Sequence, residues 1–84
     1  MKIKLIYFGR PREQLKISSE TADVPEELST LADLLAWLRG RGETWAQELA
    51  ESRVRCAINQ EFSGLTDRIG DRDEVAIFSP ISGG

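Results

Sequence analysis

One amphipathic helix decides what this chain can fold into, because it is the clearest periodic segment in the sequence. Four leucines recur at the i, i+3, i+4 and i+7 spacing of a single helix face: Leu31, Leu34, Leu35 and Leu38. Thr30 can cap the start of this helix, with Asp33 three residues on, and Gly40 can end it. A chain of 84 residues encloses one core, so the leucine face must pack on the remaining elements.

The remaining elements are mostly strands. Three segments alternate between apolar and polar side chains, as half-buried strands do: residues 2–8, 53–59 and 74–78. Residues 16–25 are only weakly strand-like, and we expect a short strand there to pair with the first. Asn59-Gln60-Glu61 indicates a tight turn, with Phe62 in a short strand beyond it.

Two short helices complete the pattern. Pro11 suits the first turn of a helix that runs to about Leu15, because its missing N–H is not needed there. A second helix should begin at Thr44, which has capping-box spacing to Gln47, and run to about Glu51. The element order predicts one layer of sheet with the leucine helix packed across it. Residues 1–78 would form this domain and residues 79–84 a flexible tail.

The sequence lacks the groups for self-contained catalysis. It contains no His, which is the usual base at neutral pH and the commonest metal ligand, so we expect no bound metal. Cys56 is the one cysteine, and its apolar neighbours favour a buried, inert thiol over a reactive one. Asp71, Asp73 and Glu74 have Gly70 and Arg72 as neighbours, which favours a turn over a metal or acid–base site.

The charge balance is mildly acidic, with 14 acidic against 11 scattered basic side chains. A nucleic-acid binder would normally concentrate its basic residues on one face. No stretch approaches the roughly 20 apolar residues that span a bilayer, and the opening residues alternate instead of forming the apolar core of a signal sequence. We therefore expect a cytoplasmic protein that binds neither nucleic acid nor membrane.

Two glycines stand at the end of the sequence, after Pro80 stiffens the exit from the last strand. Gly83 and Gly84 lack Cβ atoms, so they can enter a slot too narrow for other residues. Five extended residues reach roughly 17 Å at about 3.4 Å each, which would carry the Gly84 carboxylate into the active site of another protein. The alternative is a frayed terminus without a role. The absence of any other candidate site favours a carrier.

The chain resembles the small subunit of molybdopterin synthase along essentially its whole length. The segments that carry the resemblance are residues 2–8, Arg12-Glu13, the leucine helix, Ile58-Asn59-Gln60, residues 70–80 and Gly83-Gly84. Its most specific part is the Gly-Asp-x-Asp-Glu-Val-Ala strand followed by Pro-x-x-Gly-Gly. The resemblance implies an α+β, ubiquitin-like β-grasp fold, with a mixed sheet of about four to five strands packed on one main helix.

The resemblance also implies a sulfur-carrier cycle built around Gly84. A carboxylate is a poor electrophile, so an E1-like enzyme would use ATP to adenylate Gly84. A sulfur donor protein would then convert the acyl-adenylate to a thiocarboxylate. In the pocket of the large synthase subunit, its sulfur would attack the cyclic pterin precursor and build the dithiolene of molybdopterin. The chain would be non-catalytic alone and would itself bind no cofactor.

The same resemblance points to partner-docking residues: Phe8, Arg12, Phe62, Phe78 and Pro80. Phe8 on the first strand and Phe78 on the last fall on the faces opposite the predicted core. Large exposed aromatics near a reactive tail suggest a hydrophobic docking patch. The alternative is that these rings simply fill the far side of the sheet or its rim.

Three other functions remain open at this point. The chain could carry sulfur for thiazole or tRNA thiolation, which uses the same terminal Gly-Gly. It could be a ubiquitin-like modifier that forms isopeptide bonds between Gly84 and lysines of target proteins. It could also be a plain binding module with an inert tail.

Overall fold

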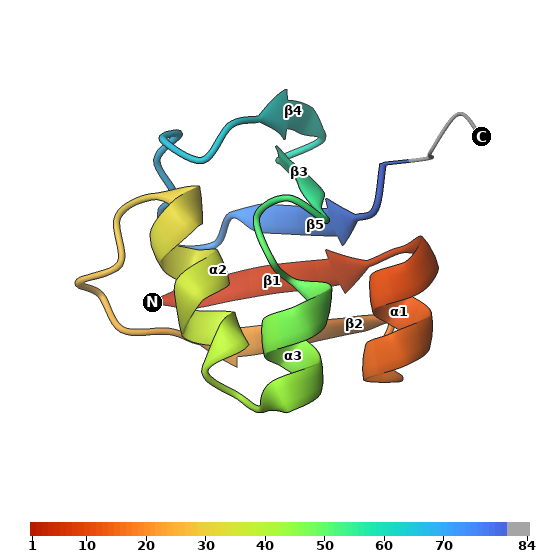
Figure 1. Ribbon diagram of the computed structural model, residues 1–84. Helices are drawn as coiled ribbons and strands as arrows, with labels where there is room; N and C mark the ends of the chain where they lie inside the picture. The colour runs from red at the N-terminus through yellow and green to blue at the C-terminus, as the bar shows by residue number, and fades with distance from the viewer. Residues whose placement is uncertain (81–84) are drawn as a thin grey trace.

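The computed structural model describes residues 1–80, so the predicted sites Gly83 and Gly84 lie outside the described residues. Figure 1 shows the elements in chain order: β1 (Lys2–Tyr7), α1 (Gly9–Leu15), β2 (Ser19–Asp23), α2 (Leu31–Arg39), α3 (Glu43–Glu48), β3 (Arg55–Ile58), β4 (Glu61–Ser63) and β5 (Glu74–Phe78). Each predicted strand and helix is present. None of the helices in residues 1–80 is long and apolar enough to cross a membrane.

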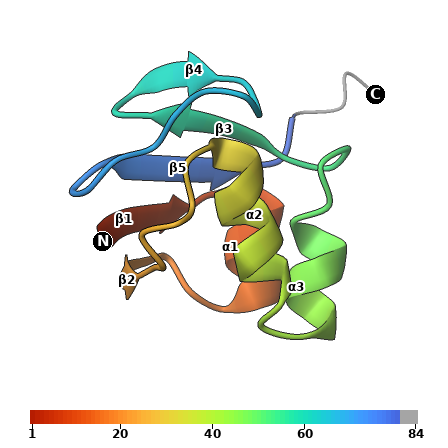
Figure 2. The same cartoon turned by 90° about the vertical axis from the view of Figure 1, so that its left-hand side faces the viewer.

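The strands form one mixed sheet in the order β2-β1-β5-β3-β4. The central strands β1 and β5 are parallel, and the other three neighbouring pairs are antiparallel. The three helices lie on one face of this sheet, so the described domain has two layers (Figure 2). The predicted α+β fold, a mixed sheet of about four to five strands packed on a main helix, is confirmed.

The core lies between α2 and the sheet. All four leucines of the helix stripe are at most 1% exposed, and the inward residues of the central strands are equally buried: Ile3, Leu5, Val75 and Ile77. The predicted cap of α2 is also confirmed. The Asp33 N–H donates to Thr30 Oγ1, and the Thr30 N–H donates to the Asp33 carboxylate, each at 3.2 Å. This reciprocal capping box explains why the helix starts at Leu31.

Three local predictions were wrong. α3 is capped by Gly42 instead of Thr44, because Gly42 adopts a φ of 155° that turns the chain into the helix. The helix ends at Glu48, three residues earlier than predicted, because Leu49 leaves the helical geometry and is fully buried. In addition, Phe8 lies one residue beyond β1, where it is the N-cap of α1.

A polar cluster joins the sheet to the helical layer where α2 turns into α3. The Tyr7 hydroxyl donates to Glu20 at 2.8 Å, and Arg41 donates to both carboxylate oxygens of Glu20 at 2.6 and 3.1 Å. The Arg41 guanidinium lies over the rings of Trp37 and Trp45. Burial opposes ionisation of Glu20, but the hydrogen bonds from Arg41 and Tyr7 outweigh it and lower its pKa.

Candidate functional site

The candidate site is the end of the sheet at which the central strand β5 terminates. This end of the strands, which is not an outer strand of the sheet, is called the exit edge below. The chain leaves the sheet at Phe78 and continues through the exposed Pro80. Because β1 runs parallel to β5, its end reaches the same edge, and the Phe8 N–H donates to the Ile77 carbonyl at 2.9 Å. β3 runs antiparallel to β5, so its first residue, Arg55, pairs with Phe78. Strands from both halves of the chain therefore frame the exit edge (Figure 1).

The sheet face opposite the helices carries an apolar patch, called the open-face patch below. It consists of Ile6, Phe8, Ala57, Phe62, Ala76 and Phe78. Strand register places Ile6 beside Ala76, Ala76 beside Ala57 and Ala57 beside Phe62, so one apolar row crosses four strands. Ile6, Ala57 and Ala76 each alternate with core residues of their own strands, which is why the row faces away from the core.

The aromatic members of this patch gather toward the exit edge. The Phe62 and Phe78 rings lie edge to face, with their centroids 5.9 Å apart. Phe62 is 86% exposed and Phe8 is 47% exposed. Phe8 keeps an extended backbone as the N-cap of α1, so it continues the alternation of β1 beyond its end. The three predicted docking aromatics thus lie on the same side of the sheet, where Phe62 and Phe8 are open to a partner.

The other two predicted docking residues are placed differently. Arg12 lies on α1, outside the sheet, and its side chain is exposed. Pro80 is exposed just beyond the end of β5. Arg12 and Pro80 therefore form no part of the open-face patch.

Sequence reasoning missed a charged group next to the exit edge. Glu48, the last residue of α3, is only 5% exposed, and Arg10 of α1 donates two hydrogen bonds to its carboxylate at 3.0 and 3.3 Å. Arg53 Nη1 lies 3.9 Å from the same carboxylate. Arg10 and Glu48 are 38 residues apart in the chain, so no spacing pattern could reveal the pair.

Cys56 is buried under α2, as predicted. Burial raises the pKa of its thiol to about 12, so the thiol stays protonated at neutral pH and is a poor nucleophile. It lines an apolar cavity of about 260 Å³ on the helical side of the sheet, together with Leu31, Leu35, Val54 and Leu65. This cavity does not open onto the apolar row of the opposite face, which lies across the sheet.

The acidic segment before β5 is a turn, as predicted. The Asp73 carboxylate accepts hydrogen bonds from the Gly70 N–H at 2.7 Å and from the Asn59 side chain at 3.0 Å. Asp71 accepts the Lys2 N–H at 2.7 Å. Asp73 thus holds the turn between β3 and β4 close to the start of β5, and Asp71 holds the start of β1 there. Within residues 1–80, no three Cys, Asp or Glu side chains come together as metal ligands would.

Comparison with known proteins adds the following similarities. The model of the ThiS family matches residues 5–84. The molybdopterin synthase sulfur carrier subunit of Homo sapiens is 33% identical over 88 residues, covering 99% of this chain and 94% of that protein. The subunit of the same name from Chlamydomonas reinhardtii is 34% identical, with both chains covered completely. The one from Escherichia coli (strain K12) is 28% identical, covering 98% of this chain and 99% of that protein.

Solved structures show the same fold. A putative molybdopterin converting factor, subunit 1, from Pyrococcus furiosus superposes with a TM-score of 0.78 at 22% identity, covering 96% of this chain and 99% of that chain. A chain from a complex of subunits 1 and 2 of molybdopterin-converting factor from Helicobacter pylori gives a TM-score of 0.67 at 21% identity, with both chains fully covered.

Proposed function

Because this chain belongs to the ThiS family and matches curated sulfur carrier subunits at 33% and 34% identity over almost its whole length, we propose that it is the sulfur carrier subunit of a molybdopterin synthase. The strongest support is that these matches run from the first strand into the terminal glycines. The relatives named above also favour this pathway over thiazole or tRNA thiolation.

The working group in this proposal is the carboxylate of Gly84. An adenylating enzyme would use ATP to form the acyl-adenylate with release of pyrophosphate, and the incoming sulfur would then displace AMP, so that sulfur replaces one carboxylate oxygen. The resulting thiocarboxylate keeps a negative charge on a soft, nucleophilic sulfur that can attack a carbon of the pterin precursor. The chain offers neither a histidine nor an accessible thiol for proton transfer, because its one thiol is buried and it contains no His. The pocket and the proton transfers would come from the large subunit.

The open-face patch would dock the large subunit. It places three aromatic rings beside the point where the chain leaves the sheet, so a partner bound there would sit where the tail begins. Exposed aromatic clusters of this kind are typical of protein interfaces, and a few such residues usually carry most of the binding free energy. The solved complex of subunits 1 and 2 from Helicobacter pylori, which has the same fold, supports a partnership of this type.

Truncating the patch is expected to weaken this docking. Phe62→Ala removes a ring that is 86% exposed, so folding should be unaffected while the affinity for the large subunit falls about tenfold or more. Calorimetric titration of the large subunit would measure the change. Leu65→Ala is the matched control, because Leu65 is a large apolar residue that is 37% exposed but lines the cavity on the helical side. Equal affinities for the two variants would contradict docking through the patch.

Intact mass spectrometry tests the function itself. After incubation with ATP, the adenylating enzyme and a sulfur donor, the chain should gain the mass that results when one oxygen is replaced by sulfur. A chain lacking Gly84 should gain nothing. If the complete chain also gains nothing, while the same enzyme loads a known carrier, the sulfur-carrier function is wrong. A ladder of conjugates on immunoblots would instead identify a protein modifier.

A further inference from the structure

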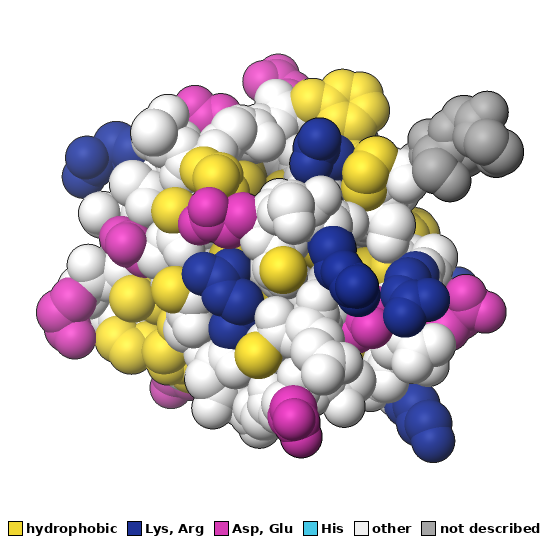
Figure 3. All heavy atoms as spheres, viewed as in Figure 1, with side chains coloured by type: hydrophobic (Ala, Val, Ile, Leu, Met, Phe, Trp, Pro, Cys, Tyr) yellow, Lys and Arg dark blue, Asp and Glu magenta, His cyan; other side chains and the backbone are white. Residues whose placement is uncertain are grey.

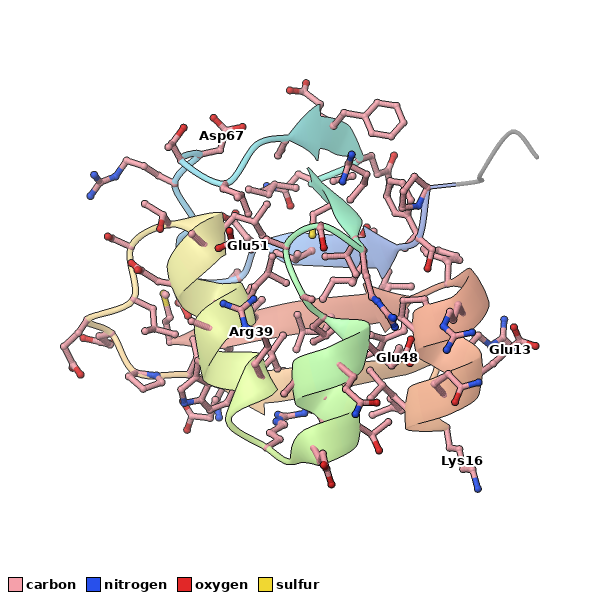
Figure 4. All side chains as sticks on the ribbon, in the orientation of Figure 1. Glu13, Lys16, Arg39, Glu48, Glu51 and Asp67 are labelled. Atoms are coloured by element: carbon pink, nitrogen blue, oxygen red, sulfur yellow. The ribbon has the colours of Figure 1, made fainter. Side chains whose placement is uncertain are left out.

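Glu48 is the one charged side chain that is buried within residues 1–80. A buried carboxylate is costly unless its oxygens are paired. Arg10 meets this need, because its Nε donates to Oε1 at 3.0 Å and its Nη2 donates to Oε2 at 3.3 Å. Figure 4 shows Glu48 between α3 and α1, whereas Glu13 points away from the domain on the far side of α1. One arginine is therefore enough to satisfy Glu48.

Arg53 is a second arginine beside Glu48, although both carboxylate oxygens of Glu48 already accept hydrogen bonds from Arg10. The Nη1 of Arg53 lies 3.9 Å from Oε2, which is beyond hydrogen-bond reach. The side chains of Arg10 and Arg53 are 58% and 55% exposed, respectively. Two guanidinium groups against one carboxylate leave a net positive charge at the surface. Arg10 gives only two of its five N–H donors to Glu48, so this charge comes with donors directed at solvent.

Stability alone does not explain this group. A buried ion pair is often no more stabilising than apolar residues of the same volume, and contacts between exposed charges contribute little to stability. The end of α3 is already anchored by Leu49, which is fully buried. Glu48 instead fixes the orientation of the Arg10 guanidinium. Arg10 therefore loses less side-chain entropy when it binds a partner.

The position of the two arginines relates them to the exit edge. Arg10 follows Phe8 by two residues, and Arg53 precedes Arg55, the residue that pairs with Phe78, by two. Figure 3 shows basic side chains gathered over α1 and beside β3, on the half of this face at which β5 ends. The arginines thus border the place where a partner must surround the start of the tail.

We propose that Arg10 and Arg53, held by Glu48, form an ionic docking site for acidic side chains of the large synthase subunit. The inference rests on the proposed function, which makes that subunit the partner that receives the tail. The formal net charge of the chain is −3, so an acidic partner surface is repelled by the molecule as a whole and attracted at this local basic site. Such a site orients the encounter so that the exit edge faces the partner.

Titration of the large subunit with Arg53→Ala at low and high salt tests this inference. Arg53 makes no hydrogen bond to Glu48, so its removal leaves the Arg10–Glu48 pair and the fold intact. We expect a loss of affinity of about tenfold at low salt, which shrinks to less than about twofold at high salt because exposed charges are screened. Arg72→Ala is the matched control: it removes the same charge from an 80% exposed side chain in the turn before β5, at the opposite end of that strand.

The outcomes separate this inference from the proposed function. If Arg53→Ala binds as well as Arg72→Ala at low salt, while the unchanged chain binds tightly, the ionic docking site is wrong and the sulfur carrier stands. A loss that is the same at low and high salt also overturns it, because the effect would then not be electrostatic. If the unchanged chain does not bind the large subunit at all, both proposals fail.

Discussion

A chain that ends at Gly83 is expected to form no dithiolene in a reconstituted synthase. Removing Gly84 pulls the terminal carboxylate back by one residue, which is about 3.4 Å along an extended chain. A misplacement of about 1 Å at a reacting centre can already cost about a hundredfold in rate. We therefore expect the rate to fall to the background of the assay, measured as molybdopterin formed per chain added.

The control for this experiment keeps the length of the tail. Ser82→Ala alters a side chain but leaves the terminal carboxylate at the same distance from the sheet, so most of the activity should remain. Both variants leave residues 1–80 unchanged, and their thermal unfolding should match that of the original chain. Undiminished dithiolene formation by the shortened chain would show that Gly84 is not the reacting group.

Leu34→Ala should have the largest effect on stability. Leu34 lies on the buried face of α2 and is 0% exposed, and truncating a buried leucine costs about 3–5 kcal/mol through lost burial and a new cavity. Total stabilities of small domains are about 5–15 kcal/mol, so the variant should be partly unfolded or close to it. Trp37 and Trp45, both half-buried, report the transition by fluorescence during urea unfolding.

The comparison for this prediction is again Leu65→Ala. Leu65 is 37% exposed, so its truncation removes less contact and should cost about 1 kcal/mol or less. If both leucine variants unfold at the same urea concentration, α2 does not close the core in the way that the structure indicates.

The elements that the sequence predicts well are those whose signal is local. The leucine spacing of α2 and the cap formed by Thr30 and Asp33 lie within nine consecutive residues, and each needs only its neighbours in the chain. The alternation of β1 and β5 likewise assigns an inner and an outer face without knowledge of the partner strands. For this reason Phe78 could be placed on the outer face from the sequence alone.

The features that the sequence does not predict depend on pairs far apart in the chain. The Arg10–Glu48 pair spans 38 residues and the Arg41–Glu20 pair spans 21, and no periodicity encodes either one. The start of α3 was missed because a glycine with positive φ competes with a capping Thr44 that has a plausible spacing. Strand order is similarly hidden: nothing local places β5 between β1 and β3.

That central position of β5 has a consequence for when the protein can act. Within the described chain, only β5 connects the β1–β2 pair to the β3–β4 pair. The open-face patch takes Phe8 from one pair, Phe62 from the other and Phe78 from β5 itself, so it exists only after the last strand has inserted. A partner that recognises the patch therefore binds only the completely folded domain. If the patch docks the large subunit, as proposed above, only chains with the completed sheet would deliver their sulfur to the pterin precursor.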